Sequence, residues 1–408
     1  MNFITKIKIK NFFSIKNEVC IDFKASDYNI ENNKNRLFDV NGEYYYNKVV
    51  SFYGANASGK TTFLKSIIVL SAVINNESTD KFPTSFKNKF ARSNSKSELE
   101  ITFILNVDNE SKEFLYKLTF KSEGYKNIGI EHEEFYRLNN NQKQNLFHRK
   151  HKKIEKVAEN IHKSVFDKLS EKKSLFQEFG KFETTGTLDK VKEFFKNLSM
   201  SSNIRSAYRT EFALSGNDTI KIAFYLGKDN NKEKLKNFLL SFLNSVGLDI
   251  SKLDTKFGEE SEKRIELLGI EIFHEIKKNV SLEFELESDG TMILIKVLVD
   301  IFLAKLNNSV LVIDELDSII HPMLVPIIIN LLIENGIQII YSTHNIYNMK
   351  FLQIDEIFLI EKDNKHKTTV QAIGDIENIK GYENLLSLYE NGYLGGLPKV
   401  KNIITEIL

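Results

Sequence analysis

The residues best suited to chemistry lie in one glycine-rich loop. Residues 54–61 read Gly-Ala-Asn-Ala-Ser-Gly-Lys-Thr, a full match to G-x-x-x-x-G-K-[ST]. Its two glycines allow a tight turn that brings backbone N–H groups against phosphate oxygens. We expect Lys60 to reach the β- and γ-phosphates of a nucleotide, and Thr61 to place its hydroxyl on Mg²⁺. An apolar run at 49–53 precedes the loop and a helical pattern follows it, so a chance match explains the loop poorly.

The start of the following helix adds to this phosphate site. Backbone N–H groups at a helix N-terminus carry partial positive charge that favours an anion. The sequence therefore predicts ATP and Mg²⁺ as cofactors. The expected nucleotide-binding residues are Gly54, Asn56, Ser58, Gly59, Lys60, Thr61 and Thr62.

Two acids follow an apolar strand pattern at 309–313. An acid at the carboxyl end of a central parallel strand lies beside such a loop, at the ligand-binding edge of the sheet. We expect Asp314 to be the carboxylate on the Mg²⁺ side, together with Thr61. Glu315 is expected to orient or deprotonate the attacking water. An acidic pair alone would fit a helix N-cap equally well, and the glycine-rich loop is what favours the catalytic interpretation.

A histidine follows the next apolar strand pattern, 337–341, in the run Ser-Thr-His-Asn. His344 could hydrogen-bond the γ-phosphate and the attacking water. An isolated histidine is usually a surface or capping residue, but this one lies one strand beyond the acidic pair. The predicted catalytic residues are therefore Glu315, His344 and Lys60.

The elements that must position these residues follow from the hydrophobic periodicity. The first third predicts strands at 3–9, 19–23 and 49–53, a helix at 60–74, and an antiparallel meander at 98–106, 113–121 and 128–138. The asparagine- and tyrosine-rich stretch 24–47 is predicted as a loop.

The last part of the chain alternates helix and strand. After a helix at 232–245, the pattern predicts strands at 263–275 and 280–287, then a helix at 290–306, a strand at 309–313, a helix at 322–334 and strands at 337–341 and 355–361. Such alternation favours an α/β fold with a parallel, helix-covered sheet.

A highly charged stretch separates these parts. Helices are predicted at 151–169, 171–179 and 187–198. Their charged faces are either solvated or form an arm that contacts protein or nucleic acid, and the sequence leaves both readings open. The stretch is too short for a long coiled-coil arm.

Composition limits the possible partners, disulfides and cellular location. The 408 residues carry a net charge of +1, which neither favours nor excludes nucleic acid, so any basic surface would have to be local. The single cysteine, Cys20, excludes a disulfide within the chain and is expected to be a small core residue. The N-terminus alternates polar and apolar residues, and no apolar run is long enough for a membrane span. These features predict a cytoplasmic protein.

The motifs in their order resemble the head of an ABC-type ATPase. GANASGKT, then SDG before a helix, then LVIDELDSIIHP, then STHN, are closest to the SMC/RecF-like branch, and within it to bacterial AAA-type ATP-binding proteins of abortive-infection and anti-phage operons. The opening ITKIKIKNFFSIKNEVCIDF, residues 136–149 and residues 383–398 resemble that family's first hairpin, strand pair and C-terminal segment.

This resemblance implies a P-loop NTPase fold of the ABC-head type, with a parallel core sheet, an antiparallel β subdomain and an inserted helical subdomain. The expected division is an N-terminal ATPase lobe at 1–147, a helical insertion at 148–260, and a C-terminal ATPase lobe at 261–408. The last lobe would hold the signature loop, the acidic pair and the histidine.

The resemblance also implies two heads that sandwich ATP, in a homodimer or a larger assembly. Ser288 and Gly290 would contact the γ-phosphate of the partner's nucleotide, although the sequence departs from the common L-S-G-G form. Asp317 would link the subunits. The glutamine lid has no matching position. Residues 12–14 would pack near adenine or simply in the core.

The function implied is an ATPase switch in anti-phage defence that controls a separate effector, nuclease or toxin. Two alternatives stay open: an SMC/RecF-like DNA-repair ATPase that binds nucleic acid, and a scaffold that uses ATP only to hold a partner. Glu315 with His344 favours hydrolysis over the scaffold. The lack of long arms and of a cysteine pair argues against a hook-ended repair ATPase.

Overall fold

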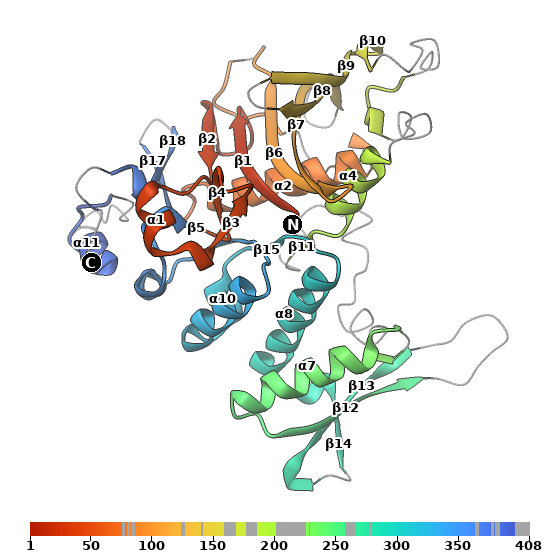
Figure 1. Ribbon diagram of the computed structural model, residues 1–408, viewed down its shortest axis with the longest axis vertical. Helices are drawn as coiled ribbons and strands as arrows, with labels where there is room; N and C mark the ends of the chain where they lie inside the picture. The colour runs from red at the N-terminus through yellow and green to blue at the C-terminus, as the bar shows by residue number, and fades with distance from the viewer. Residues whose placement is uncertain are drawn as a thin grey trace, which may run out of the picture.

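The computed structural model describes residues 1–75, 78–79, 82, 86–92, 94–123, 127–139, 142–158, 169–176, 186–200, 226–227, 229–257, 267–277, 280–363, 367–376, 379 and 384–395. Figure 1 shows their arrangement. Sheets of seven, six, three and two strands organise the described residues.

The six-stranded sheet carries the predicted site. Its strands lie in the order β11 (Ser199–Met200), β15 (Leu311–Ile313), β16 (Ile339–Ser342), β5 (Val49–Tyr53), β17 (Ile357–Lys362) and β18 (Thr368–Ala372). All pairings are parallel except that of β17 with β18. The carboxyl ends of β5, β15 and β16 therefore meet at one edge, as the alternation of helix and strand predicted.

The seven-stranded sheet is wholly antiparallel and confirms the meander. Its order is β10 (Lys153–Val157), β9 (Gln142–Lys150), β8 (Asn127–Asn139), β7 (Glu110–Glu123), β6 (Ser97–Val107), β1 (Phe3–Lys10) and β2 (Val19–Asp22). The strand pair expected within 136–149 is the β8–β9 pair.

Helix α2 (Lys60–Ile74) lies between these two sheets, which explains why it is apolar nearly all round. Its side chains join inward residues of both sheets and of α4 (Thr187–Lys196) in one core. The phosphate-binding end of the helix is therefore held between two packed layers.

The other face of the parallel sheet is covered by α8 (Asp289–Leu306) and α10 (Val325–Glu334), which share a second core with it. This core continues into a lower lobe in which α7 (Lys232–Ser245) packs on β12 (Ile250–Phe257), β13 (Leu267–His274) and β14 (Ser281–Glu283). The short helices α9 (Leu316–Ile319) and α11 (Leu385–Glu390) contribute side chains to the same second core.

Several local predictions were wrong. The stretch 24–47 is no loop: it contains α1 (Asp27–Asn32) and a hairpin of β3 (Leu37–Val40) and β4 (Tyr44–Asn47). A bidentate ion pair between the partly buried Arg36 and the buried Glu356, with atoms 2.7 Å apart, ties this stretch to the parallel sheet. That tie joins residues far apart in the sequence, so no local pattern signals it.

The predicted helix 151–169 is also wrong where it can be compared, because 153–157 form strand β10. Residues 159–168 and 177–179 lie outside the described part. Of the predicted helix 171–179, residues 175–176 are helical and 171–174 are not. The third predicted helix, 187–198, is confirmed as α4. Of 280–287 only β14 is strand, and 261–266 lie outside the described part. The domain division at 147 and 260 stays a prediction.

Cys20 is exposed, contrary to expectation. It lies on β2 between buried Val19 and Ile21, and alternation along a strand turns it to the outer face. None of the described helices is long and apolar enough to cross a membrane.

Candidate nucleotide-binding site

The glycine-rich loop joins β5 to α2 in a conformation that needs both glycines. Gly54 has φ +148° and a Cβ there would lie 2.1 Å from the Ile360 carbonyl oxygen, so no other residue fits. Gly59, at φ +123°, lies against the Ser14 hydroxyl and Thr368. The loop is therefore clamped by β17 and the start of β18, an arrangement that shapes its backbone for close approach to an anion.

Lys60 folds back over this loop. Its Nζ donates to the carbonyl oxygens of Gly54 at 2.8 Å and Ala55 at 3.1 Å, and lies 3.4 Å from His344 Nδ1. Burial lowers the pKa of Lys60 to about 8, against the opposing effect of the Asp314 carboxylate. This desolvated cation is therefore held by two carbonyl oxygens and lies beside an imidazole nitrogen, partners that phosphate oxygens could replace.

The acidic pair is joined to the loop by side-chain hydrogen bonds. The Thr61 hydroxyl donates to Asp314 Oδ1 at 3.1 Å, and the buried Ser342 hydroxyl donates to the same oxygen at 2.5 Å. The Glu315 N–H in turn donates to Ser342 Oγ at 2.8 Å. A hydroxyl and a carboxylate side by side are the oxygen donors that Mg²⁺ prefers, so these residues fit that ion.

Glu315 has a strained backbone. Its φ of 54° and ψ of 56° place it in the left-handed region, which costs a non-glycine residue about 1–2 kcal/mol. The side chain is exposed at the rim of the sheet, whereas the flanking Asp314 and Leu316 are buried. Strain of this kind accumulates at functional positions, because it directs a side chain away from the packed strand.

His344 and Asp317 meet at the same rim. The His344 N–H donates to Asp317 Oδ1 at 3.1 Å, while the imidazole approaches Lys60. The loop that holds His344 also anchors on β5, since the Thr343 N–H donates to the Phe52 carbonyl at 3.1 Å. The structure therefore brings the three sequence motifs together at one edge of the parallel sheet.

The remaining expected residues lie as follows. Asn56 is exposed at the tip of the loop and Ser58 is buried in it. The Thr62 hydroxyl is 2.6 Å from Ser14 Oγ, which places Ser14 beside α2, while Phe12 is a core residue.

Ser288 and Gly290 are not brought to the glycine-rich loop of the same chain. Ser288 caps α8, where its hydroxyl accepts from the Thr291 N–H at 3.1 Å. Figure 1 shows this end of α8 beside the lower lobe, away from β5. Glu287, just before it, lies 2.6 Å from His274 Nε2 of β13. Their predicted role therefore requires a second molecule.

Sequence reasoning missed Ser342 and Thr368. Ser342 had a usable signal, because it opens the Ser-Thr-His-Asn run at the end of a buried strand. Thr368 had none: its hydroxyl contacts the Ser58 carbonyl at 3.1 Å from a strand that follows the loop by 310 residues.

Comparison with known proteins identifies the family. The sequence model of the family described as "AAA domain, putative AbiEii toxin, Type IV TA system" matches residues 49–349, which run from β5 past His344. No curated protein matches the chain.

Solved structures of SMC head domains and of RecF are similar over most of the chain. The SMC head domain from Thermotoga maritima is 14% identical, with 90% of this chain and 98% of that chain covered and a TM-score of 0.44. The Smc head domain with an extended coiled coil from Pyrococcus furiosus, bound to the C-terminal domain of ScpA, is 14% identical, with 91% and 96% covered and a TM-score of 0.46. RecF-ATP is 14% identical, with 84% and 94% covered and a TM-score of 0.36. At these scores the likeness carries no argument about function.

Proposed function

Because the chain belongs to the AAA-domain family of the AbiEii type, we propose that it is an ABC-type ATPase that works as a nucleotide-driven switch. One observation carries this proposal: Lys60, Thr61, Asp314 and His344 converge within hydrogen-bond reach at one edge of the parallel sheet. The glycine-rich loop supplies backbone N–H groups there, and the N-terminus of α2 adds its partial positive charge.

Each binding residue contacts a different part of the triphosphate or its magnesium ion. Lys60 exchanges its carbonyl partners for β- and γ-phosphate oxygens, and the glycine-rich loop, from Gly54 to Thr62, surrounds the phosphates. Thr61 and Asp314 would hold Mg²⁺, which would neutralise negative charge on the phosphates. Ser342 fixes the Asp314 carboxylate for this purpose by donating to its Oδ1.

Hydrolysis depends on Glu315 and His344. Glu315 takes a proton from the attacking water, for which its exposed carboxylate at the rim is well placed. His344 hydrogen-bonds the γ-phosphate, and Asp317 holds the backbone of that histidine. Ser288 and Gly290 complete the site from a second copy of the chain, so that ATP closes a homodimer or a larger assembly and hydrolysis opens it.

The biological role that fits best is anti-phage defence of the abortive-infection type, in the cytoplasm, with a separate effector under control of the switch. The family description, which names a toxin, supports this role. DNA repair is the second candidate, and the basic surface described below is the observation that favours a nucleic-acid partner.

The test of the ATPase is the Glu315→Gln variant. It keeps the size of the side chain but removes the base, so hydrolysis should fall at least about 100-fold while ATP binding persists. The matched variant Lys60→Ala should lose nucleotide binding itself. Measurement of turnover, of ATP affinity and of the oligomeric state with ATP separates the two. Wild-type turnover in Glu315→Gln would remove the proposed role of that carboxylate.

The separate effector gives a further test. The purified chain should not cut DNA or RNA with Mg²⁺, and a pull-down with Glu315→Gln and ATP should retain the partner of the closed state. Cutting that is lost in Glu315→Gln but kept in Lys60→Ala would contradict a separate nuclease.

A further inference from the structure

The outer face of the seven-stranded sheet carries an ordered pattern of charge. Strand register places Lys8, Glu100, Lys117, Glu134, His148 and Lys156 in one row across β1, β6, β7, β8, β9 and β10. Opposite charges directly across strands stabilise a sheet, and like charges destabilise it. The row alternates in sign over its first four residues and then ends on a histidine and a lysine.

In the neighbouring row the alternation of charge also ends at the β9–β10 side of the sheet. It runs Lys10, Glu98, Thr119, His132, Lys150 and Lys153 over the same strands. At β9 and β10 two lysines therefore face each other directly, with Cβ atoms about 4.5–5.5 Å apart. The β1–β7 end of the face is neutralised across strands, whereas the β9–β10 hairpin places cation opposite cation.

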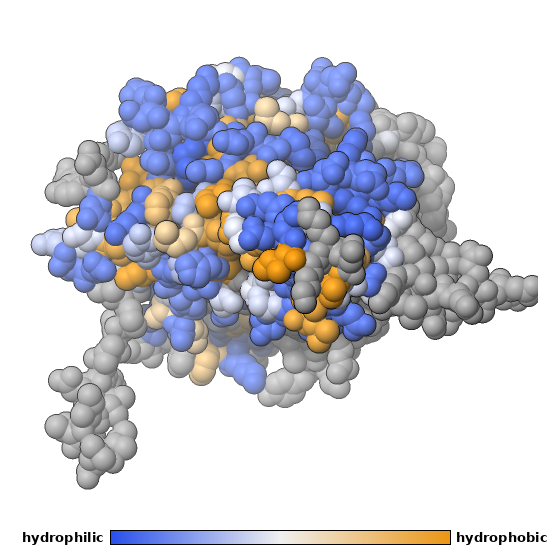
Figure 2. Space-filling view, turned by 90° about the horizontal axis from the view of Figure 1, so that it is seen from below, coloured by the Kyte–Doolittle hydropathy of each residue, from blue (hydrophilic) through white to orange (hydrophobic). Residues whose placement is uncertain are grey.

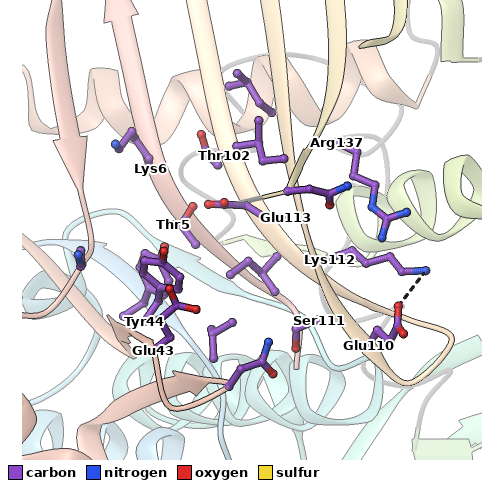
Figure 3. A pocket seen from close by; sticks show the side chains of 18 of the residues that line it. Thr5, Lys6, Glu43, Tyr44, Thr102, Glu110, Ser111, Lys112, Glu113 and Arg137 are labelled. Carbon is purple, nitrogen blue, oxygen red and sulfur yellow. Dashed lines mark ion pairs between the residues drawn. The ribbon is translucent and has the colours of Figure 1, made fainter. Parts of the chain in front are cut away.

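Ion pairs confirm this difference. At the β1–β7 end, Lys8 lies 3.0 Å from Glu18, Lys10 lies 2.8 Å from Glu98, and Lys117 lies 2.9 Å from Glu100. Figure 3 shows the groove at this end, where cations and carboxylates such as Lys6 and Glu113 are interleaved. Charge here is balanced within the protein, so this end attracts no polyanion.

Within the part of the chain that the structure describes, the hairpin lysines have no such partners. Lys150, Lys152, Lys153 and Lys156 are all exposed, and none forms an ion pair with a carboxylate among the described residues. The acids nearby have other contacts: Glu131 pairs with Lys96 at 2.5 Å, Glu171 with Lys121 at 3.2 Å, and Tyr136 donates to Glu134. One further acid, Glu155, is exposed on β10 itself, so residues 150–156 carry four lysines against one carboxylate, a local excess of positive charge in a chain with a net charge of +1.

We propose that the β9–β10 hairpin, through Lys150, Lys152, Lys153 and Lys156, is a binding surface for the phosphodiester backbone of a nucleic acid. A phosphate between opposed lysines would relieve the repulsion that the register creates. Lysine binds phosphate as a point charge, and contacts to the phosphate backbone carry no sequence information. The surface therefore holds nucleic acid without regard to sequence.

An acidic protein fits this surface less well. Protein interfaces are usually built around apolar or aromatic side chains. Among the described residues the strongly exposed large apolar side chains lie elsewhere, as with Ile276, Val280 and Leu286 of the lower lobe. Figure 2, which views the molecule from that lower end, shows apolar side chains gathered there. The hairpin is polar throughout its exposed face, as phosphate-binding surfaces are.

The experiment compares two variants with equal loss of charge on one sheet. The hairpin variant carries Lys150→Gln, Lys152→Gln, Lys153→Gln and Lys156→Gln. The control carries Lys6→Gln, Lys8→Gln, Lys10→Gln and Lys117→Gln, which remove lysines that face carboxylates. Binding of the full chain to a short labelled DNA duplex is followed by fluorescence anisotropy at about 50 and about 200 mM salt.

Wild-type affinity should drop on the order of 100-fold between these salt concentrations, as four phosphate contacts require. The hairpin variant should lose most of its binding at low salt and most of that salt dependence, whereas the control should stay within about 3-fold of wild type, below the effect of one lost contact. The melting temperature of the hairpin variant should not fall, because that variant removes the opposed lysines Lys150 and Lys153. Matched RNA duplexes and single strands identify which nucleic acid binds best.

Equal losses in the two variants would overturn the proposal, because they would show a response to net charge alone. Absence of salt-dependent binding in the wild type would do the same. Tighter binding to polyglutamate than to any nucleic acid of equal charge would assign the surface to an acidic protein instead. ATP turnover is measured in parallel and should not change, so failure here is distinguishable from failure of the ATPase proposal.

Discussion

The network around Glu133 and Arg149 and the network around Lys60 and Asp314 are built from similar groups in the same chain. In the first, the Arg149 Nε lies 2.8 Å from Glu133, and both side chains are fully buried between β8, β9 and the 170–175 segment. In the second, Lys60 donates to two carbonyl oxygens of its own loop and lies 3.4 Å from His344 Nδ1, at the rim of a sheet.

The difference lies in whether the partners are replaceable. Glu133 also accepts from the Tyr116 hydroxyl at 2.7 Å and the Ser174 hydroxyl at 2.5 Å. Arg149 donates to the carbonyls of Ser170 at 2.8 Å and Lys173 at 2.6 Å. No ligand can enter there, so those contacts fix a segment on the sheet. Under the proposed function, phosphate oxygens would replace the carbonyl partners of Lys60, so that network would change when a nucleotide binds.

The largest effect on stability is expected from a substitution that breaks the buried network. Arg149→Met leaves the Glu133 carboxylate buried without its counter-charge and should lower the free energy of unfolding by about 3–5 kcal/mol. The matched control is Lys10→Met on the same sheet, whose exposed pair with Glu98 should contribute at most about 1 kcal/mol. Chemical denaturation measures both.

Adding Glu133→Gln to Arg149→Met should recover part of the loss, because the uncompensated charge is then gone. Equal costs for Arg149→Met and Lys10→Met would show that the Arg149 network is no stronger than a surface pair. Turnover per folded molecule should stay at the wild-type value in both variants.

A smaller effect is expected at Ser342, which links the two acids. Ser342→Ala removes a donor to Asp314 and the acceptor for the Glu315 N–H, and one unsatisfied buried group costs about 1–3 kcal/mol. If that cost falls on the position of Glu315, turnover should drop by about 10- to 100-fold, since 1.4 kcal/mol is a factor of ten. ATP affinity should change only a few-fold.

Ser51→Ala is the control for Ser342→Ala. Ser51 is equally buried on the adjacent strand β5, but its hydroxyl donates to the Glu356 carbonyl at 2.6 Å, away from the nucleotide site. A purely structural effect would lower stability alike in the two variants and leave turnover alone. Turnover that is unchanged in Ser342→Ala would show that Glu315 keeps its position without this serine.

The nucleotide site was more predictable from sequence than its support. Residues 54–61 and the pair Asp314–Glu315 are short-range patterns whose chemistry is set by residue type and by the strand before them. The clamp on the loop is different, because Thr368 reaches Ser58 from a distant strand. No local period encodes such a contact, and only the packed sheet creates it.

Strand β10 is a second case in which long-range pairing limits prediction from sequence. Its lysine- and glutamate-rich sequence, 153–157, is typical of a helix surface, and the prediction was wrong. The strand pairs instead in antiparallel register with β9 at the edge of the seven-stranded sheet. Tertiary pairing overrides intrinsic preference here, as it commonly does in strands.

A change of pH gives the smallest expected effect, and it tests whether the Lys60 ammonium contacts bound phosphate. Burial lowers its pKa to about 8 in the free protein, and bound phosphates would raise it. Below pH 8 the lysine is charged in both states, so ATP affinity should be flat. Above pH 8 the free protein loses this proton while the complex keeps it, so affinity should fall by up to about tenfold per pH unit.

Lys60→Arg supplies the control for this pH profile, because a guanidinium stays charged throughout the range. Whatever its absolute affinity, that variant should show a flat profile above pH 8, measured by isothermal titration with an ATP analogue that is not hydrolysed. The same decline in Lys60→Arg would assign the titration to another group. A flat profile in the wild type would mean that the loop carbonyls and Asp314 hold the proton on Lys60 more firmly than its burial suggests.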